Sequence, residues 1–229
     1  MKIAKKNKSI YVYLKKLKYK FLSRKFGIQS DQLFQTASTT FMNRHPDIFN
    51  ILKDQYGSKK INILSFGCST GEECFSLRKY LPNATIYGID INPENIEIAK
   101  NNDLKDEQII FKQGNLEQFQ FAFKFDVILA LSVLCKNPEA EILENISCIY
   151  PFETYEKTIN HLNDLLKING LLIIRSSNFR FRDTSIFKKF EVFKTNKLRT
   201  PILFPKFDSN NNRLIDYLEN EEIFQKTII

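Results

Sequence analysis

The stretch from Ile61 to Asp90, INILSFGCSTGEECFSLRKYLPNATIYGID, decides the fold of this chain of 229 residues. Its apolar runs at 61–66 and 85–89 are typical of buried strands. Between them lie a turn with two glycines and a segment, 72–80, with a helical pattern. A strand, a glycine turn, a helix and a second strand that ends in an acid predict the nucleotide-binding half of a doubly wound α/β domain.

The glycine turn has the composition of a ligand-binding loop. Gly67 allows a tight backbone turn, and Gly71 allows the helix to pack closely against the strand. The N–H groups at the helix start can bind an anionic group. Glu72 and Glu73 stand at that start, where they would repel a pyrophosphate but suit a ligand with an ammonium or a sulfonium. We therefore expect S-adenosylmethionine rather than NAD, with plain stabilisation of the helix dipole as the alternative explanation of the glutamates.

Two later positions follow expected strands and could contact the same ligand. Asp90 ends the second strand, where a carboxylate accepts hydrogen bonds from a ribose diol. Asn115 follows the strand expected at 108–112 and could hydrogen-bond an adenine amino group. Asparagine after glycine is also ordinary turn chemistry, so the second assignment stays open.

The rest of the chain completes a Rossmann-like sheet. The continuously apolar run 125–131 predicts a strand in a sheet that is covered on both faces. The segment 152–168 is expected to be a helix that ends at Asn169-Gly170. The segments 190–194 and 222–229 suit a C-terminal antiparallel strand pair. The fold expected is α/β, with a mostly parallel seven-stranded sheet.

Basic charge is concentrated at the N-terminus. Residues 1–26 hold ten lysines and arginines and no acid, while the net charge of the whole chain is +8. We expect a basic arm over 1–29, followed by one Rossmann-like domain over 30–229. Four apolar residues of the arm share one helical face: Ile10, Leu14, Leu17 and Phe21. This face could lie on an anionic membrane or, as a less expected partner, on a nucleic acid. The alternative is that it packs on the core of the domain, with the lysines solvated on the other side.

Composition argues against several other classes. The four cysteines form no CxxC pair, and the two histidines, His45 and His161, give no zinc spacing. Neither a metal site nor a disulfide framework is expected. The sequence lacks an apolar run of about 18 residues and the apolar core of a signal peptide. The expected location is the cytoplasm. If the basic arm binds a membrane, the protein is expected at the membrane surface.

The order of elements resembles that of class I S-adenosylmethionine-dependent methyltransferases, from about Gln32 to the C-terminus. More narrowly, 67–73 resembles the C-S-T-G-E-E signature of chemotaxis-type protein-glutamate methyltransferases. The segment 40–46 is similar to that family's T-x-F-F-R segment, with a shift of one residue at Arg44. The family's later C-R-N-V-L-I-Y-F segment is replaced at 129–137, so the cofactor half carries over and the receptor-binding half does not.

The resemblance implies residue roles. Arg44 would lie over the cofactor and the reacting centre. The expected cofactor contacts are Gly67, Cys68, Ser69, Thr70, Gly71, Glu72, Asp90, Ile91, Asn115, Leu116 and Leu131. Cys68 is expected to be a packed residue rather than a nucleophile.

Methyl transfer from a sulfonium needs mainly alignment and exclusion of water. A carboxylate acceptor needs no general base, whereas a hydroxyl or an amine does. His45 is the candidate base near the expected pocket, and an exposed residue before Pro46 is the alternative.

The leading hypothesis is an S-adenosylmethionine-dependent methyltransferase, with O-methylation of a carboxylate or hydroxyl slightly favoured. The acceptor could be a small molecule, a glycan or a protein side chain. One alternative is a non-catalytic protein of the same fold at a membrane surface or nucleic acid, and a less expected one is an NAD-dependent oxidoreductase. Arg175, Arg180 and Arg182 indicate either an acidic substrate or simply solvated charges.

Overall fold

The computed structural model describes residues 13–14, 17–18, 20–25, 27, 34–35, 39–104, 106–198, 204–215, 217–218 and 221–228. The main strands are β1 (Asn62–Phe66), β2 (Thr85–Asp90), β3 (Ile109–Gln113), β4 (Phe125–Leu131), β5 (Leu166–Arg175), β6 (Phe190–Val192) and β9 (Ile223–Lys226). The α-helices are α2 (Pro46–Tyr56), α3 (Glu72–Tyr80), α4 (Pro93–Lys100) and α5 (Phe152–Leu165). Short elements are β7 (Lys206–Phe207), β8 (Arg213–Leu214), and the 3-10 turns η2 (Leu116–Gln118), η3 (Glu139–Ile142), η4 (Phe181–Asp183) and η5 (Phe187–Lys189).

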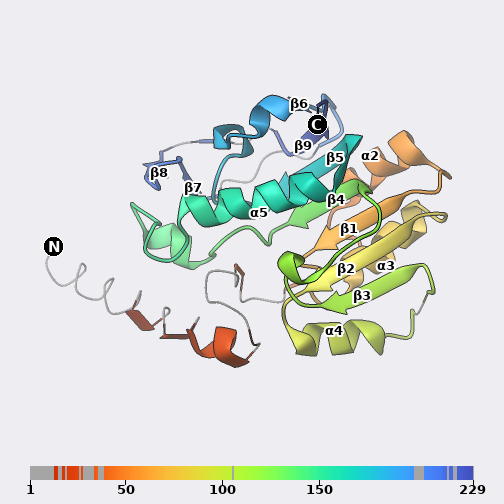
Figure 1. Ribbon diagram of the computed structural model, residues 1–229, viewed down its shortest axis with the longest axis horizontal. Coiled ribbons are helices and arrows are strands. Elements are labelled where there is room, and N and C mark those ends of the chain that lie inside the picture. Colours follow the sequence, from red (N-terminus) through yellow and green to blue (C-terminus); the bar gives the residue numbers. More distant parts are fainter. Residues whose placement is uncertain are drawn as a thin grey trace, which may run out of the picture.

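The seven main strands form one sheet in the order β3-β2-β1-β4-β5-β9-β6 (Figure 1). The first five of these strands run parallel, and β9 is antiparallel to both β5 and β6. This confirms the predicted Rossmann-like sheet and its C-terminal antiparallel pair. The strand order reverses between β1 and β4, which is where open α/β sheets bind ligands at the carboxyl ends of their strands.

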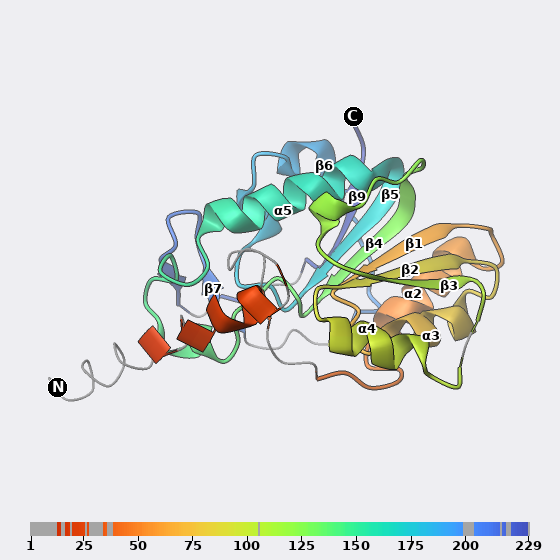
Figure 2. The same cartoon turned by 60° about the horizontal axis from the view of Figure 1, so that its bottom comes forward.

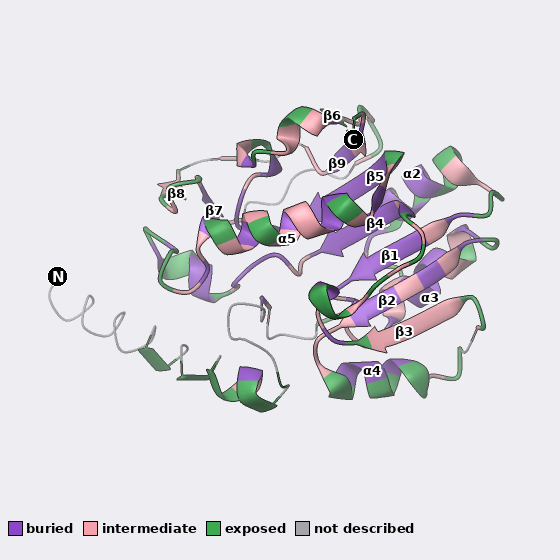
Figure 3. Cartoon of the chain, viewed as in Figure 1, coloured by how far each residue is buried: buried purple, intermediate pink, exposed green. Residues whose placement is uncertain are grey.

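Both faces of the sheet are covered, and this explains the continuously apolar strands. Ile128 and Ala130 of β4 belong to the core under α5, whereas Val127 and Leu129 belong to the core under α2 and α3. All four of these side chains are fully buried, and Figure 3 shows the central strands as buried. Alternate residues of a strand point to opposite faces, so a strand between two cores is apolar throughout.

The end of α5 differs from the prediction. The helix stops at Leu165, and β5 begins at once with Leu166, which pairs with Phe125 and is fully buried. The ladder then shifts register before Leu171. Asn169 has a φ of 63°, so the Asn-Gly pair forms an irregularity within the strand rather than a helix cap. Burial and strand pairing of Leu166 outweigh the local stop signal.

The basic arm is helical at 13–14, 17–18 and 20–25. The predicted packing of the arm's apolar face on the core is wrong for Leu14, Leu17 and Phe21, because these three side chains are exposed. Ile10, the fourth residue of that face, lies outside the described residues. Figure 2 shows the arm beside the carboxyl ends of the strands. Among the helices that the structure describes, none has both the length and the apolar character needed to cross a bilayer.

Candidate active site

A cavity of about 310 Å³ opens at the carboxyl ends of the central strands. The segments that follow four neighbouring strands all contribute to its wall: the turn after β1, the ends of β2 and β3, and the start of the loop after β4. The predicted cofactor residues among the lining are Gly67, Ser69, Asp90, Ile91, Asn115, Leu116 and Leu131. The cavity therefore lies at the switch point of the sheet, where a ligand is expected.

The turn after β1 has a backbone that glycine makes possible. Gly67 has a φ of 75° and Gly71 a φ of 94°. A Cβ on Gly67 would stand 2.4 Å from Cγ2 of Val133, and one on Gly71 would stand 2.8 Å from the ring of Phe111. The N–H groups of Gly67 and Cys68 both donate to the Ile89 carbonyl, at 2.8 and 3.0 Å. The turn is thus tied to β2 and packs closely against Val133 and Phe111.

Replacing Gly67 with alanine should lower the free energy of unfolding by about 2–3 kcal/mol, because it adds crowding against Val133 to the cost of a positive φ. Gly57→Ala is the control. Gly57 has a φ of 52° and a ψ of −119°, a conformation that costs a residue with a Cβ about 1–3 kcal/mol. The heavy atom nearest to a Cβ there is 3.7 Å away, so alanine at Gly57 has the backbone cost without the crowding. Urea unfolding of both variants measures the difference. Equal losses would show that the approach of Val133 has no cost.

Asp90 is held as an acceptor by three donors. Its Oδ2 accepts from the Ser69 N–H at 2.8 Å, and its Oδ1 accepts from the Asn92 N–H at 2.8 Å and the Asn95 amide at 3.2 Å. Burial raises the pKa of this carboxyl, although the three hydrogen bonds oppose the rise. A fixed carboxylate in the cavity wall can accept further hydrogen bonds from a diol.

The two glutamates after Gly71 have different surroundings. The Thr70 hydroxyl donates to Oε2 of Glu72 at 2.7 Å, which places that carboxylate over the turn. The Ser65 hydroxyl donates to Oε1 of Glu73 at 2.7 Å. Burial raises the pKa of Glu73 to about 7, while the Ser65 hydrogen bond and the charge of Arg44 oppose the rise. Sequence reasoning assigned Glu72 to the cofactor and did not distinguish Glu73, a half-buried acid that is hydrogen-bonded to Ser65 of β1.

Not all predicted contacts reach the cavity wall. Thr70, Gly71 and Glu72 are absent from its lining. Cys68 is 3% exposed, and burial raises the pKa of its thiol, which suits a packed residue rather than a nucleophile. Asn115 does line the cavity, but its Oδ1 caps η2 by accepting from the Gln118 N–H at 3.2 Å. The turn chemistry that remained open in the sequence is therefore present in the structure.

Arg44 and His45 separate at the start of α2. Arg44 lines the cavity, and its Nη1 donates to the Thr39 carbonyl at 2.7 Å. His45 is 2% exposed, and its Nδ1 lies 3.2 Å from Nη1 of Arg175. The structure does not bring His45 to the cavity, which corrects both its expected place near the pocket and the alternative of an exposed residue.

A second histidine takes the position expected of the first. One face of α5 contributes four residues to the cavity wall: Thr154, Lys157, Thr158 and His161. Lys157 Nζ lies 2.7 Å from Oε1 of Glu117 and so joins α5 to η2. The helical spacing of the four residues was visible in the sequence. Only the packing of α5 shows that this face borders the cavity.

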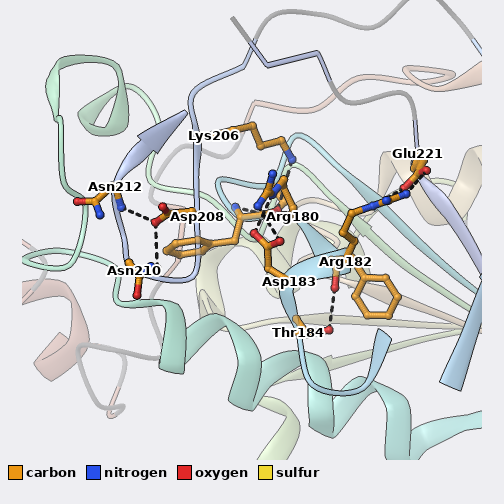
Figure 4. A network of polar contacts seen from close by, with 12 residues as sticks. Arg180, Arg182, Asp183, Thr184, Lys206, Asp208, Asn210, Asn212 and Glu221 are labelled. Atoms are coloured by element: carbon orange, nitrogen blue, oxygen red, sulfur yellow. Dashed lines mark hydrogen bonds and ion pairs between the residues drawn. The ribbon is translucent and has the colours of Figure 1, made fainter. Parts of the chain in front are cut away.

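The three arginines expected to bind an acidic substrate are all paired with acids. Arg175 forms ion pairs with Asp47 and Glu222. Figure 4 shows Arg180 directed at Asp183 and Arg182 at Glu221. None of the three arginines lines the cavity. These pairs account for the arginines structurally, so they give no support to an acidic substrate.

Three features indicate a domain that binds a nucleoside cofactor: a Rossmann-like sheet, a tightly packed glycine turn after β1 and a fixed carboxylate at the end of β2. Residues 57–219 match the family described as methyltransferase domain, and the chain belongs to this family. The prediction of a class I methyltransferase with S-adenosylmethionine as cofactor is thereby confirmed. The match gives no support to an NAD-dependent oxidoreductase, and a specific likeness to chemotaxis-type enzymes is not shown.

Two curated relatives are similar to parts of the chain. One is the ubiquinone biosynthesis O-methyltransferase of Pelagibacter ubique, 31% identical over 131 residues, which cover 57% of this chain and 48% of the relative. The other is the malonyl-[acyl-carrier protein] O-methyltransferase of Halalkalibacterium halodurans, 28% identical over 114 residues, which cover 48% and 37%. The chain thus spans about half or less of the length of these relatives.

Solved methyltransferase structures are similar to parts of the chain at low identity. The plantazolicin methyltransferase BpumL in complex with SAH is 19% identical with a TM-score of 0.43, covering 66% of this chain and 51% of that one. The magnesium protoporphyrin IX methyltransferase of Synechocystis PCC 6803 with bound SAH is 22% identical with a TM-score of 0.44, covering 56% and 52%.

Proposed function

We propose that this chain transfers the methyl group of S-adenosylmethionine to an oxygen atom of its acceptor, a carboxylate or a hydroxyl. The observation that carries the proposal is Asp90, a carboxylate fixed by three donors in the wall of a cavity at the switch point. Family membership supports the reaction class. The names of both curated relatives, which are O-methyltransferases, support oxygen as the acceptor atom.

The residues present fit the cofactor. Asp90, which lines the cavity, would accept hydrogen bonds from its ribose hydroxyls. Glu73 does not line the cavity but interacts with the charge of Arg44, which does, and it is our candidate for balancing the ammonium of the cofactor. Leu116 and Leu131 supply apolar surface in the same wall, which suits the adenine. Gly67 keeps the turn free of a side chain where the cofactor backbone would approach. The similarity of 67–73 to the chemotaxis-type signature supports the same placement of the cofactor and leaves the acceptor open among small molecules, glycans and protein side chains.

The cofactor supplies a methyl group that is already activated, so the protein has to bind, orient and keep water away. Arg44, which borders the cavity beside Thr39, is our candidate for orienting an anionic acceptor. A carboxylate acceptor would be methylated without a base. A hydroxyl acceptor would need one, and His161 is then the candidate, because it lies in the cavity wall whereas His45 does not.

Calorimetry with S-adenosylhomocysteine tests the proposal. The wild-type protein should bind, and Asp90→Ala should weaken binding by about 10–100-fold, because hydrogen bonds to a charged acceptor contribute about 1.5–3 kcal/mol each. Asp103→Ala, which removes an exposed aspartate outside the cavity, is the control. Absence of binding by the wild type, or equal affinities of the Asp90→Ala variant and the wild type, would refute the assignment.

A further inference from the structure

The helical part of the arm carries two adjacent stripes of side chains with different surroundings. Lys18, Leu22 and Lys25 line the cavity. In the neighbouring stripe, Leu14, Leu17 and Phe21 are 58%, 45% and 68% exposed. Spacings of three and four residues place each set on its own side of a helix. One stripe therefore belongs to the site, and the other presents apolar side chains to the outside. Figure 3 shows most of the described part of the arm in the exposed colour.

The charged side chains of the arm itself are all of one sign. Residues 1–26 contain ten lysines and arginines and no acid. Lys18, Lys20 and Arg24 are exposed in the described part of the arm. Exposed apolar side chains flanked by cations are the composition of a helix that lies in the surface of an anionic bilayer. Each basic side chain near such a surface adds to the attraction.

An ion pair holds this helix beside the site. Lys25 Nζ lies 2.6 Å from Oε1 of Glu94, in the first turn of α4. Both Lys25 and Glu94 also line the cavity. The apolar stripe is thus attached to the wall of the site rather than separated from it by a linker.

We propose that the stripe of Leu14, Leu17 and Phe21 docks on an anionic lipid bilayer and places this wall of the cavity at the membrane surface. A nucleic acid explains the stripe less well, because two leucines contribute nothing to phosphate contacts. A second copy of the chain also fits less well, because a symmetric contact would bring the same basic surface against itself. The proposal goes beyond methyl transfer, since docking requires no turnover.

Flotation of the full chain with vesicles tests the proposal. The protein should float with vesicles of phosphatidylcholine and phosphatidylglycerol, less so at high salt, and not with phosphatidylcholine alone. The variant Leu14→Ser/Leu17→Ser/Phe21→Ser should bind the anionic vesicles about tenfold less tightly or worse. The control Ile98→Ser/Ile168→Ser/Ile215→Ser removes three other exposed apolar side chains, 55%, 45% and 83% exposed, and should bind like the wild type.

Several outcomes would overturn the proposal. The proposal is wrong if the wild-type protein does not float with anionic vesicles. It is also wrong if the arm variant still binds these vesicles, or if the control variant loses binding to the same extent. If the wild type forms a dimer in light scattering and only the arm variant loses it, the stripe binds a second copy of the chain. If the wild type binds RNA and only the arm variant loses this binding, the stripe belongs to a nucleic-acid site. Circular dichroism verifies that both variants are folded. Calorimetry with S-adenosylhomocysteine is a separate measurement, so failure of docking and failure of the proposed function are distinguishable.

Discussion

Replacing Arg175 with methionine should lower the free energy of unfolding by about 3–5 kcal/mol. The Arg175 side chain is 1% exposed and lies at the end of β5. Its Nη1 and Nη2 donate to the two carboxylate oxygens of Asp47 at 3.0 and 2.6 Å, and its Nε donates to Oε2 of Glu222 at 2.7 Å. The guanidinium thus joins α2, β5 and the residue before β9.

The loss arises from the two acids that would remain. Asp47 and Glu222 are 12% and 17% exposed, so little water is available to solvate their charges once the arginine is gone. Burial opposes the charge of Arg175, yet the two carboxylates outweigh it and raise the pKa of the guanidinium. Methionine retains most of the packing volume, and the measured change therefore reports the loss of the guanidinium's bonds to the two carboxylates.

Two further variants make this prediction sharp in urea unfolding at neutral pH. Arg182→Met removes an arginine that is 51% exposed and paired with Glu221, and should change stability by less than about 1 kcal/mol. Adding Asp47→Asn and Glu222→Gln to Arg175→Met should recover part of the lost stability, because the two negative charges that the guanidinium balanced are then removed as well. A loss below about 1 kcal/mol in the single variant would mean that the network of Arg175, Asp47 and Glu222 contributes little to the stability of the fold.

The parts of the fold that sequence predicted correctly depend on short-range signals. The start of α4 shows how local such signals are: Asn92 accepts a hydrogen bond from the Glu94 N–H at 3.0 Å, and Pro93 occupies the first position of the helix. The bounds of α3, 72–80, also agree with its pattern. Such signals act within a few residues, so they can be read without the tertiary structure.

The misplaced residues depend on which surface of an element meets another element. His45 was expected near the pocket and is buried against Arg175, which lies 130 positions later in the chain. His161 borders the cavity because α5 presents that face to η2. Leu166 leaves the helical pattern because it pairs with Phe125 in the sheet. No local pattern specifies these contacts, since each is set by packing between distant segments.

Replacing Glu73 with glutamine should stabilise the protein more at pH 8 than at pH 5. The pKa of this carboxyl is raised from 4.5 to about 7, mainly by burial, so its charged form is disfavoured in the folded state. The penalty is absent below pH 4.5, grows as the pH rises towards 7, and is complete above that value. It amounts to on the order of 3 kcal/mol. Glutamine can still accept the Ser65 hydrogen bond without a charge.

The same substitution should weaken the binding of S-adenosylhomocysteine at pH 8, because the ammonium of the ligand would lose its carboxylate partner. For the same reason, the affinity of the wild type should rise between pH 6 and pH 8, and that of the Glu73→Gln variant should rise less. Glu72→Gln is the control, because it removes a charge from the same helical turn. The difference between the two variants, in the free energy of unfolding in urea and in the affinity from calorimetry, gives the effect of Glu73. A variant that gains stability at pH 8 and keeps full affinity would remove Glu73 from the cofactor site, whereas one that gains no stability would show that its charge is solvated. Gain of stability together with loss of affinity would show that the buried charge is kept for the ligand.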